Sequence, residues 1–210
     1  MSAEHRNPSA SGIEIREVPR SDLVAAIELV ARAMAPNPLH IAVFGKHETR
    51  RIRALRSLFS VLLADGRQVL GAYRVDELVG VIACADSPRC LLTWRTWHRY
   101  LPVVFRSGWR APLLGRWLAS WARRDPSAAH SHLGPLAVDA RLQRQGIGAA
   151  LMRHYLAHFV STGQITYLET DSATNVRFYE RFGFRTATRT RLLGVTNWFM
   201  VQNPSASLQS

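Results

Sequence analysis

The stretch from Leu133 to Met152 constrains the fold more than any other part of this sequence. It reads LGPLAVDARLQRQGIGAALM, which is an apolar strand pattern, a polar turn, a loop with two glycines and the opening of an apolar-periodic helix. The first turn of a helix offers backbone N–H groups without intrahelical partners and the positive end of the helix dipole. A strand, loop and helix in this order predict a mixed α/β fold with an anion site at the loop, most plausibly for a phosphate.

The composition is that of an ordinary soluble globular protein. The chain has 210 residues, of which 47% are hydrophobic and 20% charged, enough for one domain with a substantial core. The N-terminus has no apolar run after a basic start, and no run of about eighteen apolar residues occurs, so we expect a cytoplasmic protein. Cys84 and Cys90 lack C-x-x-C spacing, and the eight histidines form no H-E-x-x-H pair. We therefore expect free structural thiols and no metal site.

The positive charge of the chain favours an anionic partner. Lysine and arginine number 27 against 15 acidic residues, a net charge of +12. A polyphosphate cofactor, an acidic membrane surface and nucleic acid all meet this criterion. Residues 89–124 contain eight arginines, five of the six tryptophans and no acidic residue. No nucleic-acid fold signature accompanies them, so we expect no nucleic acid partner, and weak contact with a membrane surface stays open.

Apolar periodicity predicts one domain over 13–202, with an Arg/Trp-rich helical insertion at about 89–124. A disordered tail at 1–12 and a polar tail at 203–210 flank it. Strands are expected at 13–18, 68–73, 78–85, 131–138, 165–170, 185–192 and 197–202. Helices are expected at 21–34, 48–64, 91–105, 112–123, 146–161 and 173–182, with Gly66 and Gly163 ending two of them. Arg50, Arg51, Arg53 and Arg56 are interpreted as a solvated helix face.

The glycine loop does not match two common nucleotide motifs. A phosphate-cradling loop needs G-x-x-x-x-G-K-[ST], which the sequence lacks. A dinucleotide fingerprint needs a third glycine, and Leu151 stands at that position after Gly146 and Gly148. Glu169 lies at the distance of the ribose-binding acid, but too little chain follows it to complete a doubly wound sheet.

A third pattern, Q-x-x-G-x-G, is present at Gln143 to Gly148. It resembles the acetyl-CoA pyrophosphate loop of the GNAT N-acetyltransferase superfamily. The later block LETDSATNVRFYERFGF resembles the second conserved block of that superfamily. The resemblance spans about 13–202, and both blocks, together with the ending Asn197-Trp198-Phe199-Met200, are most similar to the puromycin N-acetyltransferase branch.

The resemblance implies a GNAT fold. This is an α/β fold of the α+β type, with a mixed, mostly antiparallel central sheet flanked by helices and a V-shaped splay between the fourth and fifth strands. Acetyl-CoA would be the co-substrate, and its pantetheine arm would lie beside Leu136, Ala137 and Val138, where Pro135 suits a bulge or edge. Asn175 would bind the same arm. The pyrophosphate would lie on the backbone of Gln143, Arg144, Gln145, Gly146, Ile147, Gly148 and Ala149.

Three residues are candidates for the chemistry. The resemblance assigns Tyr179 as the general acid that protonates the departing thiolate, although the spacing of Phe178 and Phe182 also suits a core position for this tyrosine. Glu169 and His132 are alternative general bases, acting directly or through water, and either is equally a structural strand-end residue. An acceptor amine of low pKa would need no base.

The expected activity is acetyl transfer to a primary amine by direct attack. A small molecule is the first expectation for the acceptor, such as an aminonucleoside-like or other toxic amine, and a protein or peptide amine is the second. A non-catalytic, CoA-sensing or membrane-associated module of the same fold is the alternative. The insertion would line the acceptor pocket, fill the core or contact anionic lipid. Monomer and homodimer are both compatible with the sequence.

Overall fold

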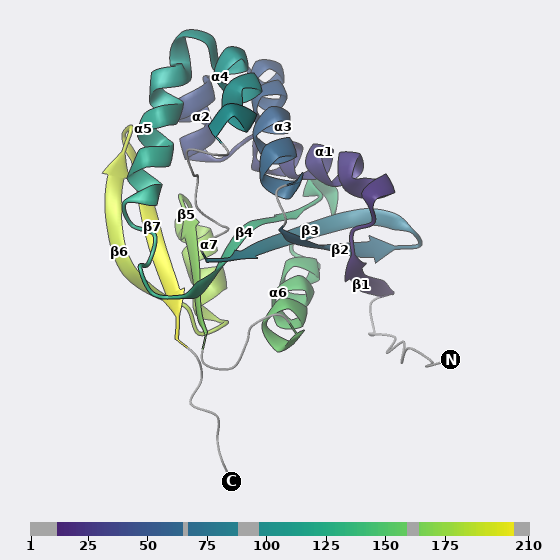
Figure 1. Ribbon diagram of the computed structural model, residues 1–210. Helices are drawn as coiled ribbons and strands as arrows, with labels where there is room; N and C mark the ends of the chain where they lie inside the picture. The colour runs from purple at the N-terminus through teal and green to yellow at the C-terminus, as the bar shows by residue number, and fades with distance from the viewer. Residues whose placement is uncertain (1–11, 65–66, 88–96, 159–163, 204–210) are drawn as a thin grey trace.

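The computed structural model describes residues 12–64, 67–87, 97–158 and 164–203. All but one residue of each expected tail (1–12 and 203–210) lies outside these ranges. So do the helix-ending glycines 66 and 163, Cys90 and the first part of the expected 91–105 helix. A seven-stranded sheet in the order β1-β2-β3-β4-β5-β7-β6 forms the centre of the molecule (Figure 1). Its strands are β1 (Ile13–Glu17), β2 (Gln68–Arg74), β3 (Glu77–Asp86), β4 (His130–Val138), β5 (Ile165–Thr170), β6 (Arg185–Leu192) and β7 (Val195–Gln202).

Helices cover both faces of the sheet (Figure 1). One face carries α1 (Leu23–Met34), α2 (Pro38–Phe44), α3 (Glu48–Ala64), α4 (Leu101–Ser107) and α5 (Ala111–Ala122). The other carries α6 (Ile147–His158) and α7 (Ala173–Glu180). Short 3-10 turns lie at η1 (Arg20–Asp22), η2 (Trp97–Tyr100), η3 (Gly108–Arg110) and η4 (Ala140–Leu142). Among the described residues, no helix is both long and apolar enough to span a membrane.

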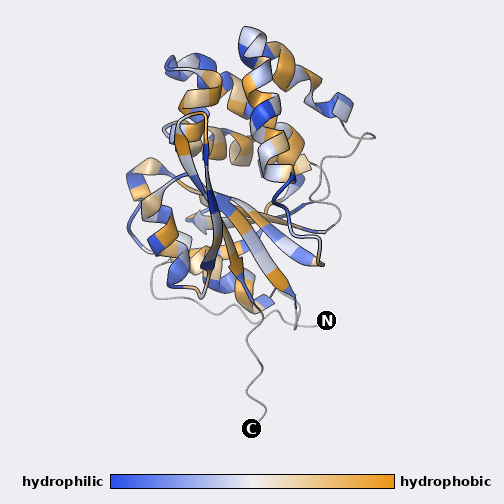
Figure 2. Cartoon of the chain, turned by 90° about the vertical axis from the view of Figure 1, so that its left-hand side faces the viewer, coloured by the Kyte–Doolittle hydropathy of each residue, from blue (hydrophilic) through white to orange (hydrophobic). Residues whose placement is uncertain are grey.

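Two separate hydrophobic cores follow from this arrangement. The core above the sheet joins α1, α2, α3 and α5 to residues such as Val81 and Ala137. The core below it joins α6 and α7 to the opposite face of the strands, with Leu151, Tyr155 and Phe184 fully buried. Orange and blue residues alternate around the helices in Figure 2, as amphipathic packing on a sheet requires.

The predicted fold class is confirmed. All strand pairs are antiparallel except β4 and β5, as the mixed, mostly antiparallel prediction required. The predicted β2–β3 hairpin is present, and its two turn residues, Val75 and Asp76, have φ values of 47° and 63°. Positive φ at both central positions matches the twist of a two-residue hairpin. The expected helix 112–123 is present as α5, one residue earlier at each end, and the described part of the expected 91–105 helix is divided into η2 and α4.

Helix α2 was not predicted, because Ala35-Pro36-Asn37-Pro38 indicated only the end of α1. Pro38 also begins α2, since proline at the first position of a helix forfeits no hydrogen bond. The backbone N–H of Leu39 donates to the Asp171 carboxylate over 2.7 Å. This partner lies 132 residues away in the sequence, so local patterns did not reveal it.

The expectation that Arg51 lies on a solvated face is wrong. Arg53 and Arg50 are exposed, but Arg51 is only 6% exposed. Its Nε donates to the Ala35 carbonyl over 2.6 Å, and its Nη1 donates to the carbonyls of Gly45 and Lys46 over 2.7 and 3.0 Å. Ala35 and Gly45 end α1 and α2, where carbonyls are unpaired and the dipole is negative. Arg51 therefore holds the ends of two helices against a third.

We expect Arg51→Met to lower the free energy of unfolding by about 3 kcal/mol, because it leaves buried carbonyls of two helix ends without a charged donor. Arg51→Lys should recover only part of this loss, since a single ammonium group cannot reproduce the fork of donors. Urea unfolding followed by circular dichroism measures both effects, with Arg53→Met on the exposed side of α3 as control. A loss for Arg51→Met no larger than that of the control would contradict this role.

Candidate active site

The site is built where β4 and β5 separate. They pair in parallel only over three positions, from His130 opposite Ile165 to His132 opposite Tyr167. Beyond these, β4 stays beside β3 up to Val138, and β5 stays beside β7 up to Thr170. The V-shaped opening expected between the fourth and fifth strands is therefore present. The edge of β4 that faces the gap is open for an extended ligand to pair with.

A bulge shapes β4 at the start of this gap. Ile82 of β3 lies opposite Leu136, whereas Cys84 lies opposite Leu133, so β4 carries one residue more than β3 over this interval. The extra residue falls at Gly134-Pro135, in agreement with the expectation that Pro135 suits a bulge. Leu136 and Val138 are half-buried and Ala137 is buried. These three predicted cofactor-binding residues thus form the end of β4, where the edge of the strand that faces β5 is unpaired.

The loop after β4 presents backbone N–H groups outward. Gly146 has a φ of 84°, and a Cβ placed on it would meet nothing within 4 Å, so a ligand can approach the backbone closely. α6 begins at Ile147, and within the described chain the N–H groups of Ile147, Gly148 and Ala149 donate no hydrogen bond. Such a cradle fits a pyrophosphate.

The other predicted loop residues surround this cradle. Arg144 is exposed and has a φ of 62°. The Gln143 side chain donates to the Val138 carbonyl over 3.3 Å, which ties the loop to the end of β4, and the Gln145 side chain accepts from Arg74 over 3.4 Å. The resemblance-based residues from Gln143 to Ala149 are therefore brought together on one surface at the start of α6.

A cavity of about 1250 Å³, counting the solvent at its mouth, lies between the splay and the helices above it. Its upper wall is apolar and aromatic, and its floor carries carboxylates. The wall includes Leu39, Leu58, Phe59, Leu62, Trp117 and Trp121. The floor includes Asp125, Glu169 and Asp171. Tyr179, His132 and Asn175 line the same space, so all the predicted catalytic residues meet in one cavity.

Tyr179 combines a packed ring with a hydroxyl that has no protein partner. The side chain is 7% exposed, and its ring lies 5.2 Å from that of Phe178 and 5.8 Å from that of Phe184. No described residue hydrogen-bonds the hydroxyl. Burial raises the pKa of Tyr179 well above its ordinary value, which keeps the phenol protonated. The core and general-acid interpretations therefore concern different parts of the same side chain.

His132 and Glu169 form a pair across the separating strands. The Nε2 atom of His132 lies 2.9 Å from Oε2 of Glu169 and donates to it, because a carboxylate only accepts. The second oxygen, Oε1 of Glu169, has no hydrogen-bond partner in the described chain. The Tyr167 ring stands at 5.2 Å from that of His132, and its pKa is raised by burial and then by the Glu169 carboxylate. Glu169 thus has one buried carboxylate oxygen that no described residue hydrogen-bonds.

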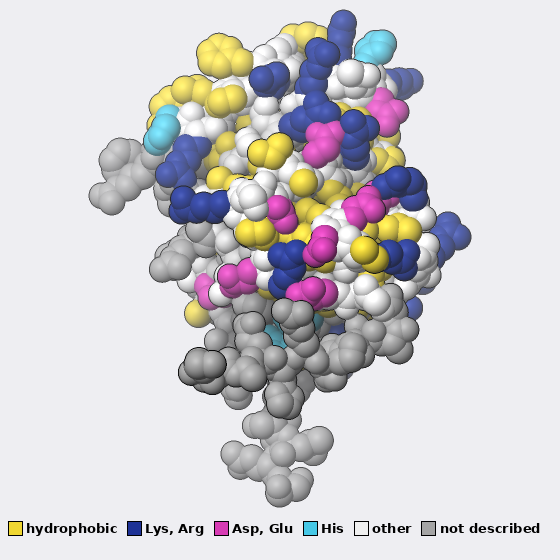
Figure 3. Space-filling view, turned by 90° about the vertical axis from the view of Figure 1, so that its right-hand side faces the viewer, with side chains coloured by type: hydrophobic (Ala, Val, Ile, Leu, Met, Phe, Trp, Pro, Cys, Tyr) yellow, Lys and Arg dark blue, Asp and Glu magenta, His cyan; other side chains and the backbone are white. Residues whose placement is uncertain are grey.

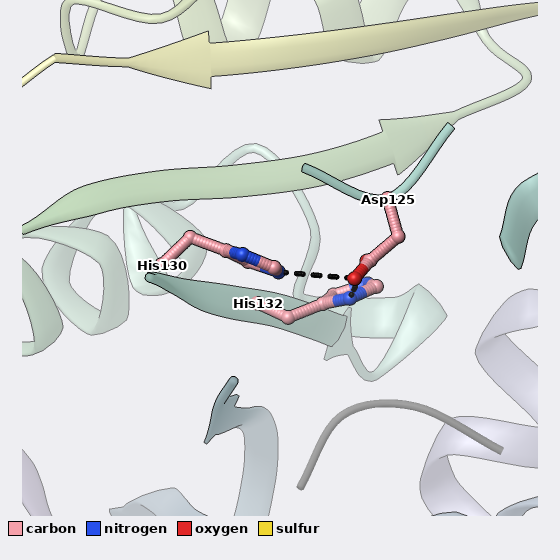
Figure 4. A group of neighbouring side chains, drawn as sticks. All are labelled: Asp125, His130 and His132. Atoms are coloured by element: carbon pink, nitrogen blue, oxygen red, sulfur yellow. Dashed lines mark ion pairs between the residues drawn. The ribbon is translucent and has the colours of Figure 1, made fainter. Parts of the chain in front are cut away.

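Asp125 lies between two histidines at the back of this pair (Figure 4). Its carboxylate oxygens are 3.4 Å from Nε2 of His130 and 3.3 Å from Nδ1 of His132. The other ring nitrogen of His130 lies 2.8 Å from the Ala128 carbonyl. The ligand atoms of Asp125, His130 and His132 all lie within 4.8 Å of one another, so this group is the one in the described chain that could hold a metal ion. The sequence did not reveal it, because Asp125 precedes β4 in a loop without motif.

Two further cavity residues were missed. His40 is buried against the rings of Phe59 and Trp117, and burial lowers its pKa. Its Nδ1 lies 2.7 Å from the Met34 carbonyl, which fixes the proton there and leaves Nε2 an acceptor. Asp171 binds the start of α2. The sequence carried no signal for His40, whereas the position of Asp171 directly after a strand was a weak one.

Only some of the tryptophans in the Arg/Trp-rich insertion line the cavity. Trp117 and Trp121 of α5 line the cavity, and Nε1 of Trp121 donates to Oδ1 of Asn197 over 3.3 Å. Trp97 and Trp109 are exposed instead, 55% and 81% respectively. Trp94 lies outside the described residues. The pocket-lining interpretation therefore holds for α5 and fails for Trp97 and Trp109.

Comparison with known proteins agrees with this geometry. Solved structures with the same fold include a histone acetyltransferase HPA2 and related acetyltransferase from Corynebacterium glutamicum, with a TM-score of 0.71 and 19% identity over 94% of this chain and 99% of that one. The PaiA N-acetyltransferase of Thermoplasma acidophilum, solved with coenzyme A, has a TM-score of 0.56 and 15% identity over 91% and 98%. A GNAT family acetyltransferase from Brucella melitensis, solved with acetyl-CoA, has a TM-score of 0.51 and 17% identity over 91% and 87%.

No sequence among curated proteins matches the chain. The family model described as Acetyltransferase (GNAT) family matches residues 35–184. This range runs from the end of α1 to Phe184 and contains the splay, the glycine loop and the cavity residues on β4, β5 and α7. The chain therefore belongs to the GNAT family of acetyltransferases.

Proposed function

We propose that the protein transfers the acetyl group of acetyl-CoA to the primary amine of a small molecule. The observation that carries this proposal is the convergence of Tyr179, Glu169, His132 and Asn175 on one cavity at the open side of the splay. The outward N–H groups of Ile147, Gly148 and Ala149 are suited to the pyrophosphate, and the free edge of β4 is suited to the pantetheine arm. The coenzyme complexes of two neighbours of the same fold support this assignment.

The reaction is a direct attack in one ternary complex. The neutral amine nitrogen bonds to the acetyl carbonyl carbon, and the carbon–sulfur bond breaks from the tetrahedral species. Tyr179 gives its phenolic proton to the departing sulfur, a role for which its neutral, buried phenol is suited. Glu169 takes the proton that the amine loses, through its unpartnered Oε1, directly or through water. His132 donates to Oε2 of Glu169 and so orients the base.

The cavity favours a particular class of acceptor. Leucine, phenylalanine and tryptophan side chains form its upper wall, and three carboxylates lie at its floor. An amine on an apolar, ring-containing body would bury its ring against the wall and place its ammonium group near the carboxylates before losing a proton. An aminonucleoside-like or other toxic amine fits this description. The block Asn197-Trp198-Phe199-Met200, which is similar to the puromycin branch, lies on β7 beside Glu169, in keeping with that layout.

We expect acetyl-CoA to raise the melting temperature and to be turned over with aromatic primary amines, measured as release of free thiol. Tyr179→Phe should lower kcat about a hundredfold with little change in acetyl-CoA affinity, because the lost group acts only on the leaving sulfur. Since burial raises the pKa of Tyr179, wild-type activity should show no alkaline loss from this group up to about pH 10.

Tyr73→Phe is the matched control, because the Tyr73 hydroxyl pairs with Asp22 away from the cavity over 2.9 Å. Coenzyme binding without turnover on any amine would point to a non-catalytic module. Turnover confined to peptide amines would overturn the small-molecule proposal and leave the transferase assignment standing. No thermal shift and no calorimetric signal with acetyl-CoA would end the proposal altogether.

Glu169→Gln tests the base separately. We expect about a hundredfold lower kcat/KM with an amine of pKa about 10, because such amines are mostly protonated near pH 7. The loss should shrink for an amine of pKa below about 7, and the variant should gain activity as the pH rises and the amine loses its proton. Glu180→Gln, exposed on α7, is the control. Equal losses for both classes of amine would exclude Glu169 as the base.

We propose that the reaction needs no metal ion, since attack, proton removal and thiolate protonation are all assigned to amine and side chains. Exhaustive dialysis against a chelator should leave turnover unchanged. If dialysis abolishes turnover and added zinc restores it in the wild type but not in His130→Asn, then Asp125, His130 and His132 hold a functional ion instead.

A further inference from the structure

Exposed hydrophobic side chains are concentrated on one short segment. Seven large hydrophobic residues are exposed in the described chain, and five of them lie between residues 97 and 109. They are Trp97, Leu101, Val104, Phe105 and Trp109, with Phe105 and Trp109 80% and 81% exposed. Scattered exposed hydrophobics are ordinary, but a contiguous group marks an interaction surface.

The helix in this segment turns an apolar stripe outward. Val103 and Ser107 of α4 are spaced i, i+4 and are buried against the protein. Leu101, Val104 and Phe105 are spaced i, i+3, i+4 and share the opposite, exposed face. Trp97 precedes this stripe by four residues and Trp109 follows it by four. The inner face of α4 is therefore already satisfied, and the outer stripe is a second apolar surface.

Arginines border this stripe, and acidic residues are missing from it. Arg99 and Arg106 are exposed on the same segment, Arg116 is exposed on the neighbouring helix α5, and the guanidinium of Arg110 lies 4.6 Å from the centre of the Trp109 ring. The sequence from 97 to 124 contains no Asp or Glu. In the upper part of the face in Figure 3, basic and hydrophobic side chains prevail, with a few acidic ones among them, and more acidic side chains lie further down.

We propose that this surface, formed by residues 97–110 with Arg116, docks on the surface of an anionic lipid bilayer. Tryptophan, phenylalanine and aliphatic side chains bury in the boundary between headgroups and acyl chains, while bordering arginines pair with anionic headgroups. The surface lies at the far end of the helical layer above the sheet (Figure 1), so a flat bilayer reaches it without meeting the sheet.

A second copy of the chain fits this surface poorly. In a two-fold symmetric interface the patch meets itself, so the bordering arginines of one copy would face those of the other with no carboxylate on the patch to pair them. The partner must supply negative charge around an apolar centre. An anionic bilayer supplies both over a continuous area.

Vesicle co-sedimentation of the full chain tests this directly. We compare vesicles of phosphatidylcholine alone with vesicles in which about a third of the lipid is phosphatidylglycerol, at about 0.05 M and about 0.5 M salt. Wild type should bind the anionic vesicles, with binding weakened at high salt. The double variant Phe105→Ser with Trp109→Ser should need at least about tenfold more lipid for half-binding. Acetyl transfer by this variant in solution should stay unchanged, because neither side chain lines the cavity.

Two matched variants separate this surface from the general charge of the chain. Val24→Ser with Val75→Ser removes exposed apolar side chains outside the proposed surface. Arg153→Gln with Arg185→Gln removes two exposed charges that lie outside the helical layer above the sheet. Both should bind like wild type, whereas Arg106→Gln with Arg116→Gln should bind more weakly. Absence of binding to anionic vesicles at low salt overturns the proposal, as does equal weakening by both arginine pairs. A wild-type dimer that Phe105→Ser with Trp109→Ser turns into a monomer also overturns it, since the surface would then join two copies.

Discussion

The early separation of β4 from β5 is the constraint on which the site depends. The strands share three paired positions, and each then continues with a different neighbour, β3 for one and β7 for the other. The bulge at Gly134-Pro135 begins two residues after His132, the last shared position of β4. Because β4 keeps its partner on one side only, its free edge, the glycine loop that follows it and the cavity above it are all brought to the same gap. No local side-chain arrangement would produce this site in a continuously paired sheet.

The residues proposed to transfer protons depend on the same separation. His132 is the last residue of β4 that pairs with β5, and Glu169 lies two residues beyond Tyr167, the last residue of β5 that pairs with β4. Their side chains meet over 2.9 Å because the strands have begun to diverge but are still close. Tyr179 approaches from α7, whose core packing holds the ring and leaves the hydroxyl without a hydrogen-bond partner among the described residues. The same packing that stabilises the fold thus fixes the orientation of the proposed general acid.

Sequence patterns predicted those parts of the fold whose cause is local. The bounds of α3, β5 and β6 follow from apolar periodicity. The position of the glycine loop follows from the backbone conformation that its glycines allow. The burial of Arg51 was missed because its partners are carbonyls at the ends of two other helices, and RRIR alone resembles a solvated run. The cluster of Asp125 with His130 and His132 was missed for the same reason, since a loop and a strand supply it jointly. Trp117 lines the cavity and Trp109 is exposed, although their sequence surroundings are alike. The packing of α5 on α2 decides which ring faces the cavity.

The bond from Leu39 to Asp171 has a consequence for how acceptor preference can change. It joins the start of α2, one wall of the cavity, to the residue that follows β5, two positions from Glu169. A substitution that enlarges the cavity by displacing α2 would pull on the end of β5, the strand that carries Glu169, the proposed base. Leu58 and Leu62 line the same cavity from α3, and their apolar side chains make no hydrogen bond to β5 or to Asp171. Variants that accept bulkier amines at unchanged turnover are therefore expected to carry substitutions in α3. Substitutions in α2 are expected to widen the range of acceptors and at the same time to lower the turnover rate.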